Sequence, residues 1–201
     1  MPAIAAARGP SAAERMKMKK RTSKQIFADT ILELSRHQTL DKITVKQIVE
    51  ESGLSMQTFY NHFKDKYELI LWIHKSEGDR LVAKLGRNGY GYDDLVRENL
   101  EFYIAHKEFM ENALQNTYGK DSYMKQSAEN AVAVWTRYIL ARHQLEEVPQ
   151  EVAFDLALYC YASVIMTAEW AFKTEFNLTA EQFARYMRNA MPPGLRGYLL
   201  A

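Results

Sequence analysis

The stretch from Thr44 to Leu69, TVKQIVEESGLSMQTFYNHFKDKYEL, constrains the fold of this chain more than any other. Thr44 followed three residues later by Gln47 is a capping-box pattern, and apolar residues then recur at helical spacing. A short helix should therefore begin here. Gly53 stands where this helix must end, because the left-handed backbone conformation costs glycine less than a residue with a Cβ atom.

A second short helix is predicted directly after the glycine turn. Ser55 can cap this helix, in which Phe59 and Phe63 lie one turn apart and face inward. Gln57, Thr58 and Asn61 then face outward. Two short helices joined by a tight glycine turn form a helix-turn-helix.

The outward side chains of the second helix suit DNA. A helix of this size fits the major groove, where the amides of Gln57 and Asn61 can pair bidentately with adenine. Met56 and the methyl group of Thr58 suit a thymine methyl group. A helical hairpin with a merely polar face is the alternative that this pattern leaves open.

Phosphate contacts are expected beside these base contacts. Tyr60, His62 and Lys66 are placed to meet phosphates, which set the register of a protein on DNA without reading its sequence. The candidate DNA-binding residues are Thr44, Ser55, Met56, Gln57, Thr58, Tyr60, Asn61, His62 and Lys66.

These residues also carry a family resemblance. The matching positions are Thr44, Ile48, Gly53, Ser55, Thr58, Phe59, Tyr60, Phe63, Lys66 and Leu69. Together they resemble the DNA-binding domain of TetR-family transcriptional regulators over about the first third of the chain. Met56-Gln57 stands where many members carry Lys-Gly, which changes what the helix reads, and Val49 stands where alanine is usual. The run 57–61 resembles the DhaS-like branch, regulators associated with dihydroxyacetone utilisation.

The resemblance implies an all-α fold and a homodimer. An N-terminal three-helix head would bind DNA, and a larger C-terminal helical bundle would dimerise and often hold a small-molecule pocket. The resemblance also assigns Tyr60 and Lys66 to phosphate contacts. We accordingly expect a flexible basic arm at 1–21, a helix-turn-helix DNA-binding domain at 22–66, and a dimerisation and ligand-binding domain at 67–201.

The remaining helices are expected from caps and apolar spacing. Thr22 with Gln25 can cap a first helix that reaches about His37. The helix beginning near Lys66 should run on to Leu85, and any ligand effect on the head must pass through it. Further helices are expected at 93–106, 108–115, 122–144, 152–172 and 179–191, with a loop at 86–92.

The apolar run 152–172 should be buried on most sides. We do not expect it to span a membrane, because Asp155 and Glu169 bracket only about a dozen uncharged residues and a span needs about 20. The monomer core can account for this helix, but the family resemblance favours a four-helix dimer interface with the helix at 179–191.

Charge is divided unequally along the chain. The net charge is +1, yet the residues through Lys66 hold 12 Lys and Arg against 7 Asp and Glu. A basic N-terminal end favours a polyanionic partner, here double-stranded DNA with an inverted repeat. The basic cluster of residues 15–21 reads either as an arm that follows the phosphates or as a solvated tail.

Composition favours no enzyme, metal site or cofactor. The five histidines show no pair at i, i+3 or i, i+4 spacing, so a metal site lacks a nucleus, and no phosphate-cradling loop or nucleophile elbow is present. Cys160 is the only cysteine, so a reduced, cytoplasmic protein with a structural thiol is expected. The N-terminus lacks the apolar region of an export signal.

The body is rich in aromatic residues, which line small-molecule pockets as well as ordinary cores. The candidate pocket residues are Trp72, Tyr103, His106, Trp135, Tyr138 and Trp170. The sequence thus predicts a sequence-specific DNA-binding regulator, a dimeric repressor that responds to a small molecule. An activator or co-regulator that acts through a protein partner and an architectural DNA binder remain as alternatives.

Overall fold

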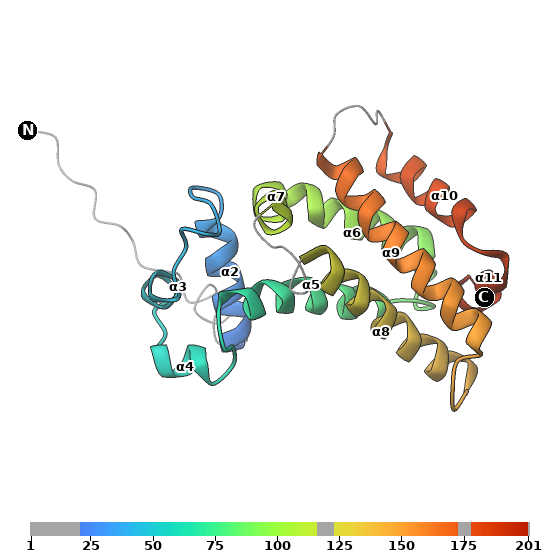
Figure 1. The fold of residues 1–201 in the computed structure, drawn as a ribbon, viewed down its shortest axis with the longest axis horizontal. Coiled ribbons are helices and arrows are strands. Elements are labelled where there is room, and N and C mark those ends of the chain that lie inside the picture. The colour runs from blue at the N-terminus through green and yellow to red at the C-terminus, as the bar shows by residue number, and fades with distance from the viewer. Residues whose placement is uncertain (1–20, 116–122, 173–177, 201) are drawn as a thin grey trace, which may run out of the picture.

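The computed structural model describes residues 21–115, 123–172 and 178–200, and every regular element within these ranges is a helix. A small head and a larger helical body lie at opposite ends of the molecule, and one long helix, α5 (Lys66–Val82), runs between them (Figure 1). The predicted all-α class is confirmed. Apart from Arg21, the predicted basic arm lies outside the described residues, as does the segment expected to separate 108–115 from the next helix.

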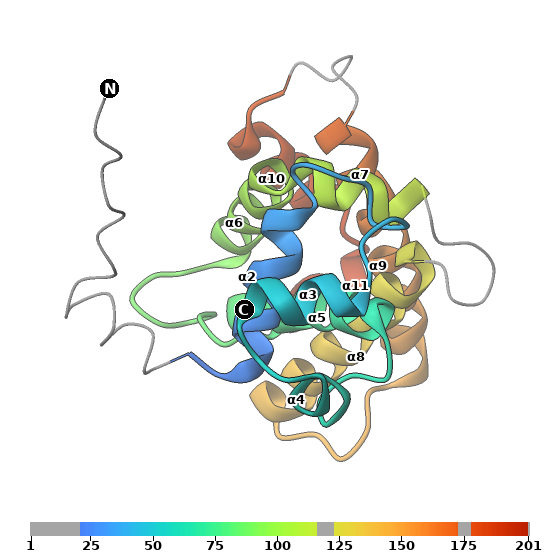
Figure 2. The ribbon, with the colours of Figure 1, turned by 90° about the vertical axis from the view of Figure 1, so that its left-hand side faces the viewer.

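The head consists of α2 (Ser23–Leu34), α3 (Val45–Ser52) and α4 (Met56–Tyr60). Both predicted capping boxes are present: Thr22 and Gln25 begin α2, and Thr44 and Gln47 begin α3. Gly53 ends α3 with φ of +69°, the left-handed conformation that the sequence predicts at this position. Figure 2 looks onto the head, with α3 across its middle and α4 at its lower edge.

Two helices of the head are shorter than the sequence predicts. The first ends at Leu34, and turns replace its expected last residues to His37. The second ends at Tyr60, so Phe63 lies in the following turn and not in the helix. Phe63 is still buried, because its backbone N–H donates to the carbonyl of Phe59 at 2.9 Å and keeps the ring one turn away on the inner side.

The linking helix α5 begins as predicted and is continuous through Gly78. Asp65 caps it by accepting a hydrogen bond from the backbone N–H of Glu68 at 2.9 Å. The helix ends at Val82, before the predicted Leu85, and Lys84 beyond its end binds the carboxylate of Glu98 at 2.7 Å.

The body packs two long helices, α8 (Tyr123–His143) and α9 (Gln150–Phe172), against each other and against α5 and α6 (Tyr92–Ala105). The helix α7 (Lys107–Gln115) lies between body and head, and α10 (Ala180–Ala190) packs on α6 (Figure 1). A final helix, α11 (Pro193–Leu199), is absent from the sequence-based expectation. Pro193 at its first position is the signal that could have predicted it.

Two apolar cores run through the molecule. The first fills the head with residues such as Phe27, Ile48 and Phe59, and it continues past Ile73 to Tyr103 and neighbouring side chains of the body. The second joins α5, α6 and α8 to the three C-terminal helices. The head therefore does not have a core closed off from the body.

The helix α9 is apolar in composition, but less than half of it is buried. Residues Gln150–Trp170 reach the length and mean hydropathy, 1.3, of a membrane-crossing helix, so the charges at Asp155 and Glu169 do not by themselves exclude a span. Length and composition are shared by the core helices of globular domains. Here 39% of that segment is buried, and its inner side, including Leu156 and Cys160, belongs to the second core.

Candidate nucleic-acid interface and ligand cavity

The short helix α4 is fixed in place by a cap at its beginning and by one buried aromatic ring. The Ser55 hydroxyl oxygen accepts a hydrogen bond from the backbone N–H of Thr58 at 3.0 Å and lies 2.8 Å from the Thr58 hydroxyl. Phe59 is fully buried and meets Phe27 of α2 edge to face, with ring centroids 5.2 Å apart. Such a helix, too short to be stable alone, is held by its cap and its one buried ring.

The opposite side of α4 is exposed to solvent. Met56 and Tyr60 are 39% and 54% exposed, and Gln57, Asn61 and His62 are exposed as well. The Nε2 amide of Gln57 donates to Oδ1 of Asn61 at 2.8 Å. This bond leaves the Gln57 oxygen as an acceptor and the Asn61 amide as a donor, the two groups that a bidentate contact with adenine requires.

Thr44 and Lys66, both sequence-predicted DNA contacts, make hydrogen bonds to other residues of the head. The hydroxyl and backbone N–H of Thr44 are bound to Gln47 in the capping box of α3. The Lys66 ammonium donates to the carbonyl oxygens of Leu40, Asp41 and Ile43 at 2.6, 2.9 and 2.8 Å.

The assignment of Lys66 to a phosphate contact therefore does not fit this structure. An ammonium has three N–H donors, and all three are satisfied by the loop before α3. Burial also lowers the pKa of Lys66 from its usual value. Lys64, in the turn between α4 and α5, is an exposed lysine that the sequence analysis does not name.

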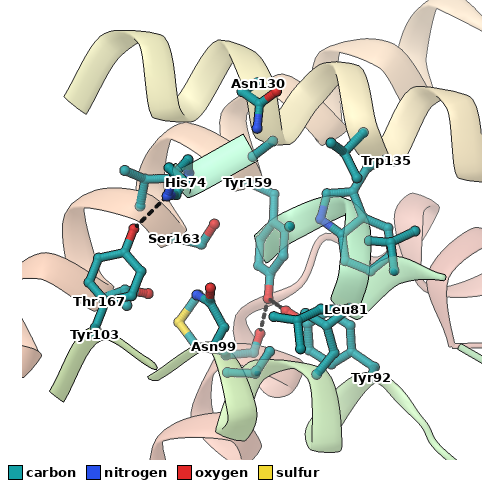
Figure 3. A pocket seen from close by; sticks show the side chains of 18 residues that line it. His74, Leu81, Tyr92, Asn99, Tyr103, Asn130, Trp135, Tyr159, Ser163 and Thr167 are labelled. Carbon is teal, nitrogen blue, oxygen red and sulfur yellow. Dashed lines mark hydrogen bonds between the residues drawn. The ribbon is translucent and has the colours of Figure 1, made fainter. Parts of the chain in front are cut away.

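The body contains a cavity of about 100 Å³ between α5, α6, α8 and α9 (Figure 3). Each of these helices contributes a polar residue, and all four contribute two cavity-lining residues at i, i+4 spacing that include a polar one. The polar residues of the lining are His74, Tyr92, Asn99, Tyr103, Asn130, Tyr159, Ser163 and Thr167. Polar residues at i, i+4 inside otherwise apolar helices are the sequence signal that could have indicated them.

One wall of the cavity is formed by a partly buried histidine on α5. His74 lies between Tyr103 and Tyr123, with edge-to-face ring contacts, and its Nδ1 is 3.3 Å from the Tyr103 hydroxyl. Burial lowers the pKa of His74 to about 4, so its ring is neutral at physiological pH. Burial likewise raises the pKa of Tyr103 above its usual value.

The opposite end of the cavity is closed by a tyrosine pair. The hydroxyls of Tyr92 and Tyr159 are hydrogen-bonded to each other, and the Tyr159 hydroxyl also lies 2.6 Å from the carbonyl oxygen of Met187. Trp135 stacks at an angle beside Tyr92, with ring centroids 6.1 Å apart. Next to this pair, burial raises the pKa of the free Cys160 thiol to about 12, which fits the structural role expected of it.

The cavity takes in part of the predicted pocket. Tyr103 and Trp135 line it. Tyr138 packs on the side of Trp135, and Trp72 packs against Phe63 of the head. The other two also lie elsewhere: His106 follows the end of α6 against Phe102, and Trp170 packs against Phe183.

The part of the chain that the structure describes holds no cluster of metal-ligating side chains. Within those residues, no three His, Cys, Asp or Glu side chains are grouped so that they could hold a metal ion.

Residues 28–73 match the family of bacterial regulatory proteins named tetR. This match covers most of α2, the glycine turn, the exposed α4 and the beginning of the linking helix α5, and the fold of the described residues agrees with it. The head of this chain is thus similar to TetR-family regulatory proteins, and the described remainder has a similar fold.

Among curated proteins, this chain is similar to the HTH-type dhaKLM operon transcriptional activator DhaS of Lactococcus lactis subsp. lactis (strain IL1403). The two are 25% identical over 88 residues, which is 44% of this chain and only 40% of that relative. The chain thus spans less than half of the length of this curated relative.

Solved structures share the TetR-family fold over most of the chain. The dihydroxyacetone kinase operon activator DhaS has a TM-score of 0.61 at 16% identity, covering 88% of this chain and 97% of that one. A TetR transcriptional regulator from Rhodococcus sp. RHA1 has a TM-score of 0.56 at 14% identity, with coverages of 85% and 96%. The repressor AlkX from Dietzia sp. strain DQ12-45-1b has a TM-score of 0.53 at 12% identity, with coverages of 89% and 97%.

Proposed function

We propose that two copies of this protein bind an inverted-repeat operator in the cytoplasm and regulate transcription there in response to a small molecule. The observation that carries the proposal is the paired amides of Gln57 and Asn61, exposed on a helix that Ser55 and Phe59 hold rigidly. A rigid outward donor and acceptor can read a base pair in the major groove without first paying to order their own side chains.

The phosphate contacts that we propose are Tyr60, His62 and Lys64. All three are exposed beside α4. Lys64 takes the place that the family resemblance gives to Lys66, whose ammonium is occupied. Residues 21–66 contain 7 Lys and Arg against 6 Asp and Glu, so most of the basic excess of the N-terminal end lies in the arm. The arm is therefore proposed to supply much of the electrostatic attraction to DNA.

Dimerisation is supported by an exposed apolar stripe on α9. Phe154, Leu158, Tyr161 and Ile165 recur at helical spacing and are 69%, 57%, 39% and 47% exposed. Apolar side chains of this size on one face of a helix mark an interaction surface. A second copy is the proposed partner, since a single α4 of five residues reads too few bases and two heads related by a two-fold axis read a palindrome.

The proposed effector site is the cavity beside α5. His74 and Gly78 of this helix line the cavity, and Ile73 belongs to the core that continues into the head. A ligand that changes the packing of α5 would tilt the head and alter the spacing of the two α4 helices. We retain 22–66 as the DNA-binding unit and 67–201 as the dimerisation and effector unit, with α5 shared between them.

Repression is the proposed sign of regulation, because a dimer bound across a promoter blocks it without further contacts. Activation is a second candidate, favoured by the similarity to DhaS, whose name describes an activator. A co-regulator that acts through a protein partner and an architectural DNA binder are the remaining alternatives, and they differ from both in lacking a specific operator.

The proposal is tested by selecting bound duplexes from a random pool with the full-length protein. The wild type should enrich an inverted repeat, and Gln57→Ala/Asn61→Ala should lose it, at about 1 to 3 kcal/mol for each bidentate contact. The matched control removes two exposed amides of the body, Gln150→Ala/Asn189→Ala, and should enrich the same repeat. Equal binding of all sequences by wild type and variant would instead identify an architectural protein.

A further inference from the structure

The cavity beside α5 has a lining without formal charge. Among the described residues, no Asp, Glu, Lys or Arg lines it, and His74 is neutral at physiological pH. A charged ligand would lose its hydration there without gaining a counter-charge, which is strongly unfavourable. The lining therefore selects for uncharged molecules.

The polar groups of the lining have unused hydrogen-bonding capacity. In the described residues, the side chains of Asn99, Asn130 and Thr167 make no hydrogen bond within the protein, although Thr167 is only 7% exposed. Asn130 approaches from α8 and Asn99 from α6, on opposite sides of the cavity, while Thr167 comes from α9 (Figure 3). Each amide offers both a donor and an acceptor, and the hydroxyl offers either, which suits ligand hydroxyl and carbonyl groups.

The size of the cavity limits the ligand further. About 100 Å³ is well below the roughly 300–1,000 Å³ of pockets for drug-sized molecules. Apolar side chains such as Leu81, Val82 and Val164 complete the lining and can contact a short carbon skeleton. A long alkyl chain or a multi-ring compound does not fit this volume, whereas a few carbon atoms with attached oxygens do.

We propose that the cavity binds a small, uncharged polyhydroxy or hydroxycarbonyl compound through Asn99, Asn130 and Thr167. The ligand bridges α6, α8 and α9, and the adjacent His74 and Gly78 bring α5 into contact with it. This inference rests on the proposed function for its regulatory meaning, but the binding itself does not require DNA.

Binding is measured by titration calorimetry on the full-length protein with named probes. Dihydroxyacetone, glycerol and erythritol represent the proposed class, dihydroxyacetone phosphate and glycerate add a charge, and toluene is apolar. At least one neutral hydroxy compound should give a saturable isotherm, and its charged counterpart should bind at least about tenfold more weakly. No saturation by the neutral compounds up to roughly 10 mM, or preferential binding of the charged or apolar probes, would overturn the proposal.

Two variants locate the site. Thr167→Val keeps the shape of the side chain and removes its hydroxyl, and it should weaken binding about five- to tenfold. Asn99→Leu should do the same, and the control Asn189→Leu, at an exposed position of α10, should not change the affinity. If Asn99→Leu fails to fold, the near-isosteric Thr167→Val still decides the matter, and unchanged affinity in it would reject the site.

Repeating the DNA selection with the bound compound present tests the regulatory role separately from ligand binding. Saturable binding with no effect on the selected operator would leave the ligand class standing and reject the effector role. Operator binding without affinity for any neutral probe would leave the regulator standing and reject the ligand class.

Discussion

The ammonium nitrogen of Lys66 lies 2.6 Å from the carbonyl oxygen of Leu40, which stands 26 residues earlier in the chain. The same ammonium binds Asp41 and Ile43, so the first residue of α5 is tied to the loop that leads into α3. Through these bonds α5 is coupled to α3. It is also coupled to α4, which directly precedes it in sequence.

Lys66→Met should therefore lower the stability of the head without changing the number of phosphate contacts. We expect a loss of about 1 to 2 kcal/mol in the free energy of unfolding, because three carbonyl oxygens lose their donor at a partly solvated site. Lys64→Met, at an exposed position, should leave stability unchanged and reduce the salt dependence of operator binding by about one phosphate equivalent. The reverse pattern, with a reduced salt slope for Lys66→Met at full stability, would return Lys66 to the phosphate contacts.

Two glycines should respond to alanine with opposite signs. Neither position has an atom within 4 Å of the added Cβ, so the difference is one of backbone conformation and not of space. Gly78→Ala in the interior of α5 should stabilise the protein by about 1 kcal/mol. Gly53→Ala, with φ of +69°, should destabilise it by about the same amount. Urea denaturation of both variants checks the prediction, and two shifts of the same sign would refute it.

The neutral, partly buried His74 makes stability dependent on pH on the acidic side. Its pKa is about 4 in the folded protein and about 6.5 in an unfolded chain, so protonation favours unfolding. The full stability is present above about pH 6.5 and is lost progressively as the pH falls toward 4, with a loss of about 2 kcal/mol at pH 5.

The variant His74→Gln, which cannot titrate, separates this effect from that of the other histidines. The difference in unfolding free energy between pH 7 and pH 5 should shrink by about the same 2 kcal/mol in this variant, measured by urea denaturation at each pH. Equal pH dependence in wild type and variant would show that His74 is not the residue responsible.

The exposed stripe of α9 should determine the oligomeric state. Phe154→Asp/Leu158→Asp replaces two apolar side chains, 69% and 57% exposed, with charged ones. Because both positions are exposed, the monomer should stay folded, and the buried charges should prevent association. Sedimentation equilibrium should give a dimer for the wild type and a monomer for this variant. Ile104→Asp is the control, since Ile104 is 49% exposed on α6, away from the stripe, and should remain dimeric.

Local rules made the head predictable from sequence. The caps at Thr22, Thr44 and Ser55 and the left-handed Gly53 depend on residues within a few positions of one another, and all four are found where the pattern places them. The role of Lys66 was not predictable in this way. Its partners lie more than 20 residues away, and no spacing rule distinguishes a lysine bound to carbonyls from one that meets a phosphate.

The body was predictable in its helices but not in its cavity. Trp72 and Trp170 pack against the two cores and Tyr103 and Trp135 belong to them, and only the packing of four helices decides that Tyr103 and Trp135 also line a cavity. Asn99 and Asn130 lie on separate helices, so their places around one cavity depend on how α6 and α8 each pack against α5 and α9, which the sequence pattern does not specify. The short α11 was missed because seven residues are too few for a periodic signal.

Ile73 and His74 are consecutive residues of α5, yet one packs in the core that reaches the head and the other lines the cavity. Substitutions that adapt this turn to a different ligand therefore also change how firmly the head is held. During divergence of such proteins, a new ligand preference and a retained fold have to be acquired together. Lineages that change the cavity should accordingly do so first at lining residues such as Asn99, Asn130 and Thr167, which do not belong to the core that reaches the head.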